Sequence, residues 1–149
     1  MAAGLAAMGI DKGDLVACQL PNWWQTTALH LACIRIGAIL NPLMPIFRER
    51  ELRFMLKHGE AKLLVIPKIF RGFDYEAMID GIRGELPNLE TLLVIDGEGE
   101  RSFEQRLMET PWEEKQDTKA LFAERQLSAD DAVQILYTSG TTGEPKGVV

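Results

Sequence analysis

Positive charge is scarce in this sequence. Lysine and arginine together number 16, aspartate and glutamate number 22, and the net charge of the 149 residues is −6. Because a broad nucleic-acid-binding face needs clustered basic residues, we expect no nucleic-acid partner. The composition still permits a small anionic ligand, since one local loop can outweigh a diffuse negative background.

Long hydrophobic runs and targeting signals are missing too. The most apolar region, residues 26–40, contains His30 and Arg35 and is too short and too polar to span a bilayer. The first residues carry no basic segment ahead of their apolar part, which makes them a poor signal peptide. We therefore expect a cytoplasmic protein with no integral membrane segment.

Cysteine and histidine occur only twice each. Cys18 and Cys33 lie among apolar neighbours without C-x-x-C spacing, so we predict two buried thiols in a reducing compartment. A disulfide between them is the weaker alternative. His30 and His58 lack partners at metal-ligand spacing, which predicts ordinary core or surface histidines.

Short apolar runs alternate with amphipathic stretches along most of the chain. The runs are nearly all apolar, as strands covered on both faces should be. Alternating strands and helices predict an α/β fold, with a mostly parallel sheet flanked by helices. The expected strands are residues 14–20, 38–41, 62–66 and 91–96, and the expected helices are residues 23–36, 48–58, 74–86 and 102–110.

The first of these long helices carries specific expectations. Asn22 is placed to cap it, and Gly37 is placed to end it in a left-handed conformation. Trp24, Ala28, Leu31, Ile34 or Arg35, and Ala38 recur at helical spacing, which predicts the helix. The two tryptophans at its start, Trp23 and Trp24, are predicted to be core anchors.

The polar stretch "YTSGTTGEPKG", residues 137–147, directly follows the apolar run "AVQILY". Its glycines permit positive φ and close approach of a ligand, and successive N–H groups in such a turn form an anion-binding concavity. Threonine and serine hydroxyls add donors, and Lys146 adds a positive charge. This combination predicts a polyphosphate-binding loop on a hairpin, and a plain hairpin connection is the alternative. The loop fails the Walker pattern because Gly147 follows Lys146, and no G-x-G-x-x-G follows the first strand.

The same stretch resembles the phosphate-loop signature of the adenylate-forming enzymes, which include acyl-CoA synthetases, luciferases and peptide-synthetase adenylation domains. An aromatic residue followed by [ST]-S-G-[ST]-[ST]-G-x-P-K-G is matched at every position. The stretches "QLPNWW" and "NPLMPIFRERELRFML" look most like bacterial acyl-CoA synthetases for medium-chain fatty acids or cyclohexanecarboxylate-type acids. The resemblance covers nearly the whole chain.

This resemblance implies the N-terminal portion of a large domain, with residues 1–127 as an α/β subdomain that is incomplete at its start. Residues 128–149 are then the strand and phosphate-binding loop that open the next part. The implied reaction is a two-step ligation that uses ATP, Mg²⁺, coenzyme A and a small carboxylic acid. Glu144 is expected to point to solvent. The residues implied to hold the β- and γ-phosphates with Mg²⁺ are Thr138, Ser139, Gly140, Thr141, Thr142, Gly143 and Lys146.

Members of that family are much longer than 149 residues. The rest of the acyl pocket, the magnesium-binding glutamate and the lid with its catalytic lysine are implied to lie beyond Val149. We therefore expect no catalytic residue within the chain and no activity from the chain alone. A non-catalytic nucleotide-binding or interaction module is the alternative.

Overall fold

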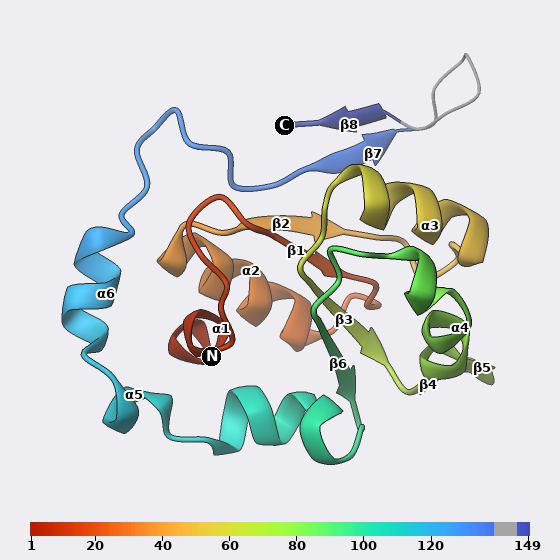
Figure 1. Cartoon of the computed structure of the whole chain (residues 1–149), viewed down its shortest axis with the longest axis horizontal. Coiled ribbons are helices and arrows are strands. Elements are labelled where there is room, and N and C mark those ends of the chain that lie inside the picture. The colour runs from red at the N-terminus through yellow and green to blue at the C-terminus, as the bar shows by residue number, and fades with distance from the viewer. Residues whose placement is uncertain (139–145) are drawn as a thin grey trace.

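A four-stranded parallel sheet forms the centre of the chain (Figure 1). The computed structural model describes residues 1–138 and 146–149. Each neighbouring pair of strands is parallel, and the strand order is β2-β1-β3-β6. The predicted α/β fold with a mostly parallel sheet is thereby confirmed. The strands are β1 (Leu15–Cys18), β2 (Ile39–Pro42), β3 (Leu63–Pro67) and β6 (Thr91–Ile95).

Helices cover both faces of this sheet and enclose a hydrophobic core on each. Side chains alternate along β1, so Val16 and Cys18 face one core while Leu15 and Ala17 face the other. All residues of β1 and β3 are buried, which explains their uninterrupted apolar sequences. The first core is closed by α1 (Ala2–Ala7), α2 (Trp24–Ile36) and a π-helical turn, η3 (Glu104–Glu109), and the second by α3 (Glu49–His58) and α4 (Tyr75–Ile82).

The start of α2 differs from the prediction. Trp23 is the N-cap residue in place of Asn22, and no side chain there bonds a free amide. The Thr26 hydroxyl instead donates a hydrogen bond back to the Pro21 carbonyl oxygen at 3.0 Å. The end is as predicted, because Gly37 takes a left-handed conformation with φ 73°.

The predicted helix α2 is present, but the residues whose spacing predicts it do not all face the core. Trp24 and Leu31 are 58% and 63% exposed, whereas the side chains that enter the core are Leu29, Ala32, Cys33 and Ile36. The cause is that apolar residues occur on nearly every side of this helix, so spacing alone does not distinguish the two faces. Trp24 is therefore no core anchor, while Trp23 packs against the first core.

The two cysteines are free and buried in the first core. Burial raises the pKa of the Cys18 thiol to about 12, and it raises the pKa of Cys33 further. Because the thiolate is the reactive form, both thiols are inert at neutral pH. The prediction of buried thiols is confirmed.

A largely exposed connection leads from the α/β unit towards the C-terminus. Polar contacts hold it to the loop that precedes β1. The Lys12 ammonium donates to the Gln126 carbonyl oxygen and pairs with Asp131, both at 2.9 Å, and Arg125 donates to the Ile10 carbonyl oxygen at 2.6 Å. The remaining elements are β4 (Ile69–Phe70), β5 (Phe73–Asp74), η1 (Arg83–Glu85), η2 (Gly99–Arg101), α5 (Trp112–Lys115), α6 (Thr118–Glu124), β7 (Leu136–Thr138) and β8 (Lys146–Val148).

Two helical glycines are expected to respond oppositely to alanine. A Cβ on Gly4 would lie 2.8 Å from Cδ1 of Trp112 and 3.0 Å from Cδ2 of Leu107, so Gly4→Ala should destabilise the chain by about 1–3 kcal/mol through overpacking. A Cβ on Gly81 in α4 would meet nothing within 4 Å, so Gly81→Ala should stabilise by about 0.4–1 kcal/mol. Urea unfolding of both variants beside wild type measures the difference. Equal effects of the two substitutions would contradict the packing of α1 against Trp112.

Candidate functional site

The phosphate-loop candidate is carried by an antiparallel hairpin of β7 and β8. Leu136 pairs with Val148, Tyr137 with Gly147, and Thr138 with Lys146. The predicted hairpin is thus present, and two predicted site residues, Thr138 and Lys146, face each other across its two strands. The other predicted site residues lie outside the described residues, and their roles stay predictions: Ser139, Gly140, Thr141, Thr142 and Gly143, together with Glu144.

Thr138 and Lys146 can act on one ligand. Directly opposed residues of an antiparallel pair have Cβ atoms about 4.5–5.5 Å apart. Both side chains are exposed, and no acidic residue among residues 1–138 and 146–149 forms an ion pair with Lys146. A hydroxyl and an ammonium group placed in this way suit an external anion.

The hairpin lies beside the β2 edge of the sheet (Figure 1). The Leu40 amide donates to the Val133 carbonyl oxygen at 3.1 Å, and the Ile135 amide donates to the Leu40 carbonyl oxygen at 2.9 Å. This short parallel pairing, with Gln134 opposite Leu40, guides the chain along β2 into β7.

A second attachment joins β7 to the C-terminal end of α3. The Tyr137 hydroxyl donates to the Met55 carbonyl oxygen at 3.2 Å and lies 3.0 Å from Nδ1 of His58. Burial raises the pKa of Tyr137, so its hydroxyl keeps its proton at neutral pH. The sequence predicts only an ordinary core or surface residue at His58, because no local pattern joins residues 79 apart.

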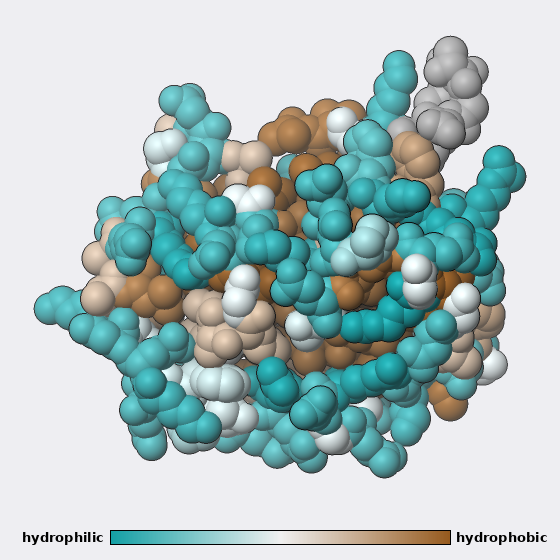
Figure 2. Space-filling view, viewed as in Figure 1, coloured by the Kyte–Doolittle hydropathy of each residue, from teal (hydrophilic) through white to brown (hydrophobic). Residues whose placement is uncertain are grey.

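The hairpin also presents apolar surface to solvent. A hollow of about 430 Å³ lies along Val133, Leu136, Thr138 and Val148. Figure 2 shows hydrophobic residues gathered at this place, over β7 and β8. An isolated two-stranded hairpin is marginally stable at best, which makes its attachments to β2 and α3 important for its position.

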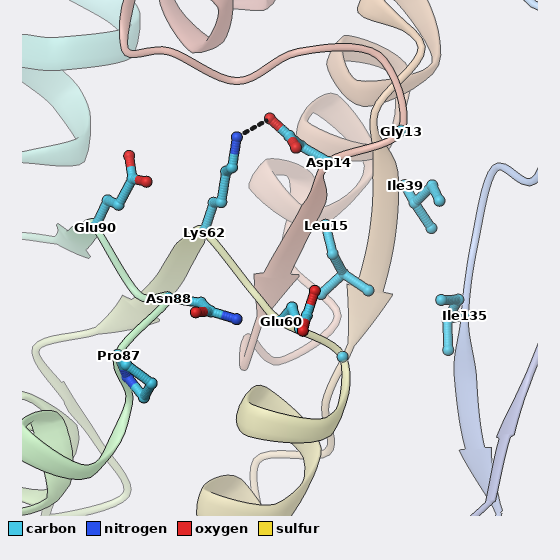
Figure 3. A pocket seen from close by; sticks show the side chains of 11 residues that line it. Gly13, Asp14, Leu15, Ile39, Glu60, Lys62, Pro87, Asn88, Glu90 and Ile135 are labelled. Carbon is cyan, nitrogen blue, oxygen red and sulfur yellow. Dashed lines mark hydrogen bonds and ion pairs between the residues drawn. The ribbon is translucent and has the colours of Figure 1, made fainter.

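A larger cavity, of about 460 Å³, lies at the amino ends of the parallel strands (Figure 3). The Lys62 ammonium there pairs with Asp14 at 2.7 Å, and this hydrogen bond raises the pKa of Lys62. Glu60 and Glu90 also line the cavity. Its acidic lining is unsuited to a polyphosphate, and ligands of open α/β sheets bind beyond the carboxyl ends of the strands. The polyphosphate site predicted at the hairpin therefore stays the candidate site.

Two further features bear on function. Among the described residues, no group of three or more histidine, cysteine, aspartate or glutamate side chains could hold a metal ion. None of the helices in residues 1–138 and 146–149 combines the length and the apolar character needed to cross a membrane.

Comparisons with known proteins cover the whole chain. The family model described as AMP-binding enzyme matches residues 1–149. A medium-chain fatty-acid–CoA ligase of Escherichia coli (strain K12) is 33% identical over 149 residues, which are 100% of this chain and 26% of that protein.

Solved structures agree in fold. A fatty acyl CoA synthetase of Mycobacterium tuberculosis superposes with a TM-score of 0.77 at 27% identity, over 99% of this chain and 26% of that one. The N-terminal domain of FACL13 from the same organism superposes with a TM-score of 0.69 at 27% identity, over 99% of this chain and 33% of that one. The chain thus spans about a quarter to a third of the proteins it matches.

Proposed function

Because the chain belongs to the AMP-binding enzyme family, we propose that it forms part of an ATP-dependent ligase that joins a carboxylic acid to coenzyme A. Its sheet and helices have the fold of the N-terminal part of the large domain of an adenylate-forming enzyme. The observation that carries the proposal is the pairing of Thr138 with Lys146 at the two ends of the Gly/Thr-rich segment. Since the chain covers 26% of the Escherichia coli ligase, the activity is proposed for a longer protein that contains it.

The hairpin residues are proposed to hold the β- and γ-phosphates of ATP. Lys146 supplies the compensating positive charge, and Thr138 supplies a hydroxyl donor at the other end of the segment. Backbone N–H groups of Gly140 and Gly143 add donors without bulk. The hydroxyls of Ser139, Thr141 and Thr142 complete the proposed set.

The proposed reaction has two steps. A carboxylate oxygen attacks the α-phosphorus of ATP, the bond to the bridging oxygen breaks, and acyl-adenylate and pyrophosphate form. The sulfur of coenzyme A then attacks the acyl carbon and displaces AMP. Because the first step brings an anion up to a polyanion, Lys146 and the hairpin donors act by neutralising charge and by holding the leaving pyrophosphate in line.

Mg²⁺ fits this arrangement as an ion held by phosphate oxygens and hydroxyls. It prefers oxygen ligands and commonly binds together with substrate phosphates, which suits the threonine-rich hairpin and the lack of a carboxylate cluster among the described residues. When bound, it would neutralise part of the phosphate charge.

The finer assignments are proposals as well. We propose a medium-chain acid as substrate, a cytoplasmic location, and a division of the chain into an α/β subdomain at residues 1–127 and the opening of the next part at residues 128–149. The name of the Escherichia coli ligase supports the acid class.

Pyrophosphate release by the full-length protein tests this function. The assay uses ATP, Mg²⁺ and straight-chain acids of graded length, with and without coenzyme A. We expect release that depends on the acid, and a thioester product when coenzyme A is present. ATP binding without release for any acid would favour the non-catalytic alternative and contradict the ligase.

A further inference from the structure

The C-terminal end of α3 forms a socket for the Tyr137 side chain. We call this the tyrosine socket and define it by the Phe54 ring, the Met55 carbonyl oxygen, the His58 ring and Gly59. Tyr137 has one hydroxyl proton, which it donates to Met55 at 3.2 Å. Nδ1 of His58 lies 3.0 Å from the Tyr137 oxygen, and in the tautomer with a proton on Nδ1 it donates to that oxygen.

The rings of the socket pack in a regular arrangement. Phe54 and His58 are stacked, with centroids 5.4 Å apart and planes at 19°. Tyr137 meets both edge-on, with centroid distances of 6.3 Å to Phe54 and 5.9 Å to His58. Edge-to-face contacts of this kind hold a ring in one orientation.

Glycine at residue 59 is explained by the same contact. Its φ is −81°, which any residue adopts, so the backbone does not require glycine there. A Cβ on Gly59 would lie 3.2 Å from the Tyr137 hydroxyl and 3.1 Å from the Met55 carbonyl oxygen. A side chain at residue 59 would crowd both oxygens, so glycine leaves room for the contact between Tyr137 and Met55.

The Tyr137 ring lies on the same side of the hairpin as the missing side chain of Gly147. A Cβ on Gly147, its cross-strand partner, would lie 3.6 Å from Cε1 of the ring. Tyr137 immediately precedes Thr138, and Gly147 immediately follows Lys146. The side chain of Tyr137 therefore holds β7 at the residue next to Thr138, and the pairing of Tyr137 with Gly147 links this point to β8 next to Lys146.

We propose that the tyrosine socket sets the position of the phosphate-binding hairpin relative to the sheet, with Tyr137, His58 and Gly59 as positioning residues for ATP. The proposal rests on the function proposed above. Together with the pairing at Leu40, this contact joins β7 to the α/β unit. A hairpin held in place before ATP arrives binds the phosphates without first losing conformational freedom.

Hydrogen exchange on the 149-residue chain tests the tether without any need for activity. Tyr137→Phe removes the hydroxyl and keeps the ring. We expect amides of β7 and β8 to exchange about 2- to 12-fold faster, the range for one lost hydrogen bond, while those of β3 keep their wild-type rates. The matched control is Tyr75→Phe, because the hydroxyl of the only other tyrosine donates to the Pro45 carbonyl oxygen away from the hairpin. In this control, the exchange rates of the β7 and β8 amides should stay at their wild-type values.

Steady-state kinetics of the full-length protein tests the effect on ATP. Tyr137→Phe, His58→Ala and Gly59→Ala should each raise KM for ATP about 2- to 12-fold and leave KM for the acid unchanged. His58→Asn, whose amide N–H stands near the place of Nδ1, should restore much of the loss. A merely structural role would lower the melting temperature of the variants without separating the two KM values.

The hydrogen-exchange and kinetic experiments can each contradict a different part of the proposal. Equal acceleration of exchange in β3, β7 and β8, or no acceleration at all, would overturn the socket as a tether. Equal changes in both KM values would overturn its role in positioning ATP. If the wild-type protein activates no acid, the proposed ligase reaction is contradicted. The hydrogen-exchange measurement then decides by itself whether the tyrosine socket holds the hairpin.

Discussion

The 149-residue chain by itself is expected to give no acid-dependent pyrophosphate release above background. Adenylation depends on holding two anions together, and this positioning supplies a large part of the rate. Of the residues proposed to bind the phosphates, the structure describes Thr138 and Lys146, which pair across the hairpin. In the adenylate-forming enzymes that the sequence resembles, the acyl pocket and the catalytic lysine belong to later parts of the protein.

The comparison is made with the purified chain and the full-length protein at equal concentration, over the same panel of acids. Circular dichroism first confirms that the chain is folded, so that inactivity does not merely report unfolding. ATP binding to the chain is measured in parallel. Clear turnover by the chain alone would refute the assignment of the catalytic groups to the rest of the protein.

Lys146→Ala in the full-length protein is expected to lower kcat/KM for adenylation about 10- to 150-fold. This range corresponds to the loss of one hydrogen bond to a charged group, about 1.5–3 kcal/mol at about 1.4 kcal/mol per tenfold. The loss should be nearly the same for every acid, because a contact with ATP alone contributes equally to all substrates. A graded series of acids, with wild type and variant measured side by side, gives the result.

Two variants make this measurement specific. Lys119→Ala removes an exposed lysine on α6 and should leave kcat/KM unchanged. Lys146→Arg keeps the charge and should recover part of the loss. A penalty that changes several-fold along the acid series would place Lys146 near the acyl group. Wild-type activity in Lys146→Ala would favour the alternative interpretation, in which the hairpin is a plain connection without a phosphate site.

The fold was more predictable from the sequence than the site. The parallel strands are continuous apolar runs because both faces of the sheet are covered, so their positions follow directly from the residues. The buried face of α2 did not follow, since Trp24 and Leu31 are as apolar as the residues that enter the core. Only the neighbouring elements decide which side is buried.

One part of the candidate site could be predicted from the sequence and another part could not. The glycine- and threonine-rich segment and its two flanking strands have a local signature, which predicts the hairpin. The contact of Tyr137 with His58 has none, because it joins residues 79 apart through a single hydrogen bond and ring packing. Gly59 is the C-cap residue of α3, and the sequence does not show that a side chain there would also crowd the Tyr137 hydroxyl.

The pairing at Leu40 has a consequence for self-association. Strand β2 is one of the two outer strands of the sheet, and its alternate residues turn their amides outward. Within β2, all of which the structure describes, Leu40 offers its N–H to this edge and already bonds Val133, while Pro42 has no N–H to offer. The segment at residues 133–135 thus covers the β2 edge, which would otherwise be a template for a strand of another molecule. A version cut before Val133 would lose this cover, so shortening the chain to isolate the α/β unit invites aggregation.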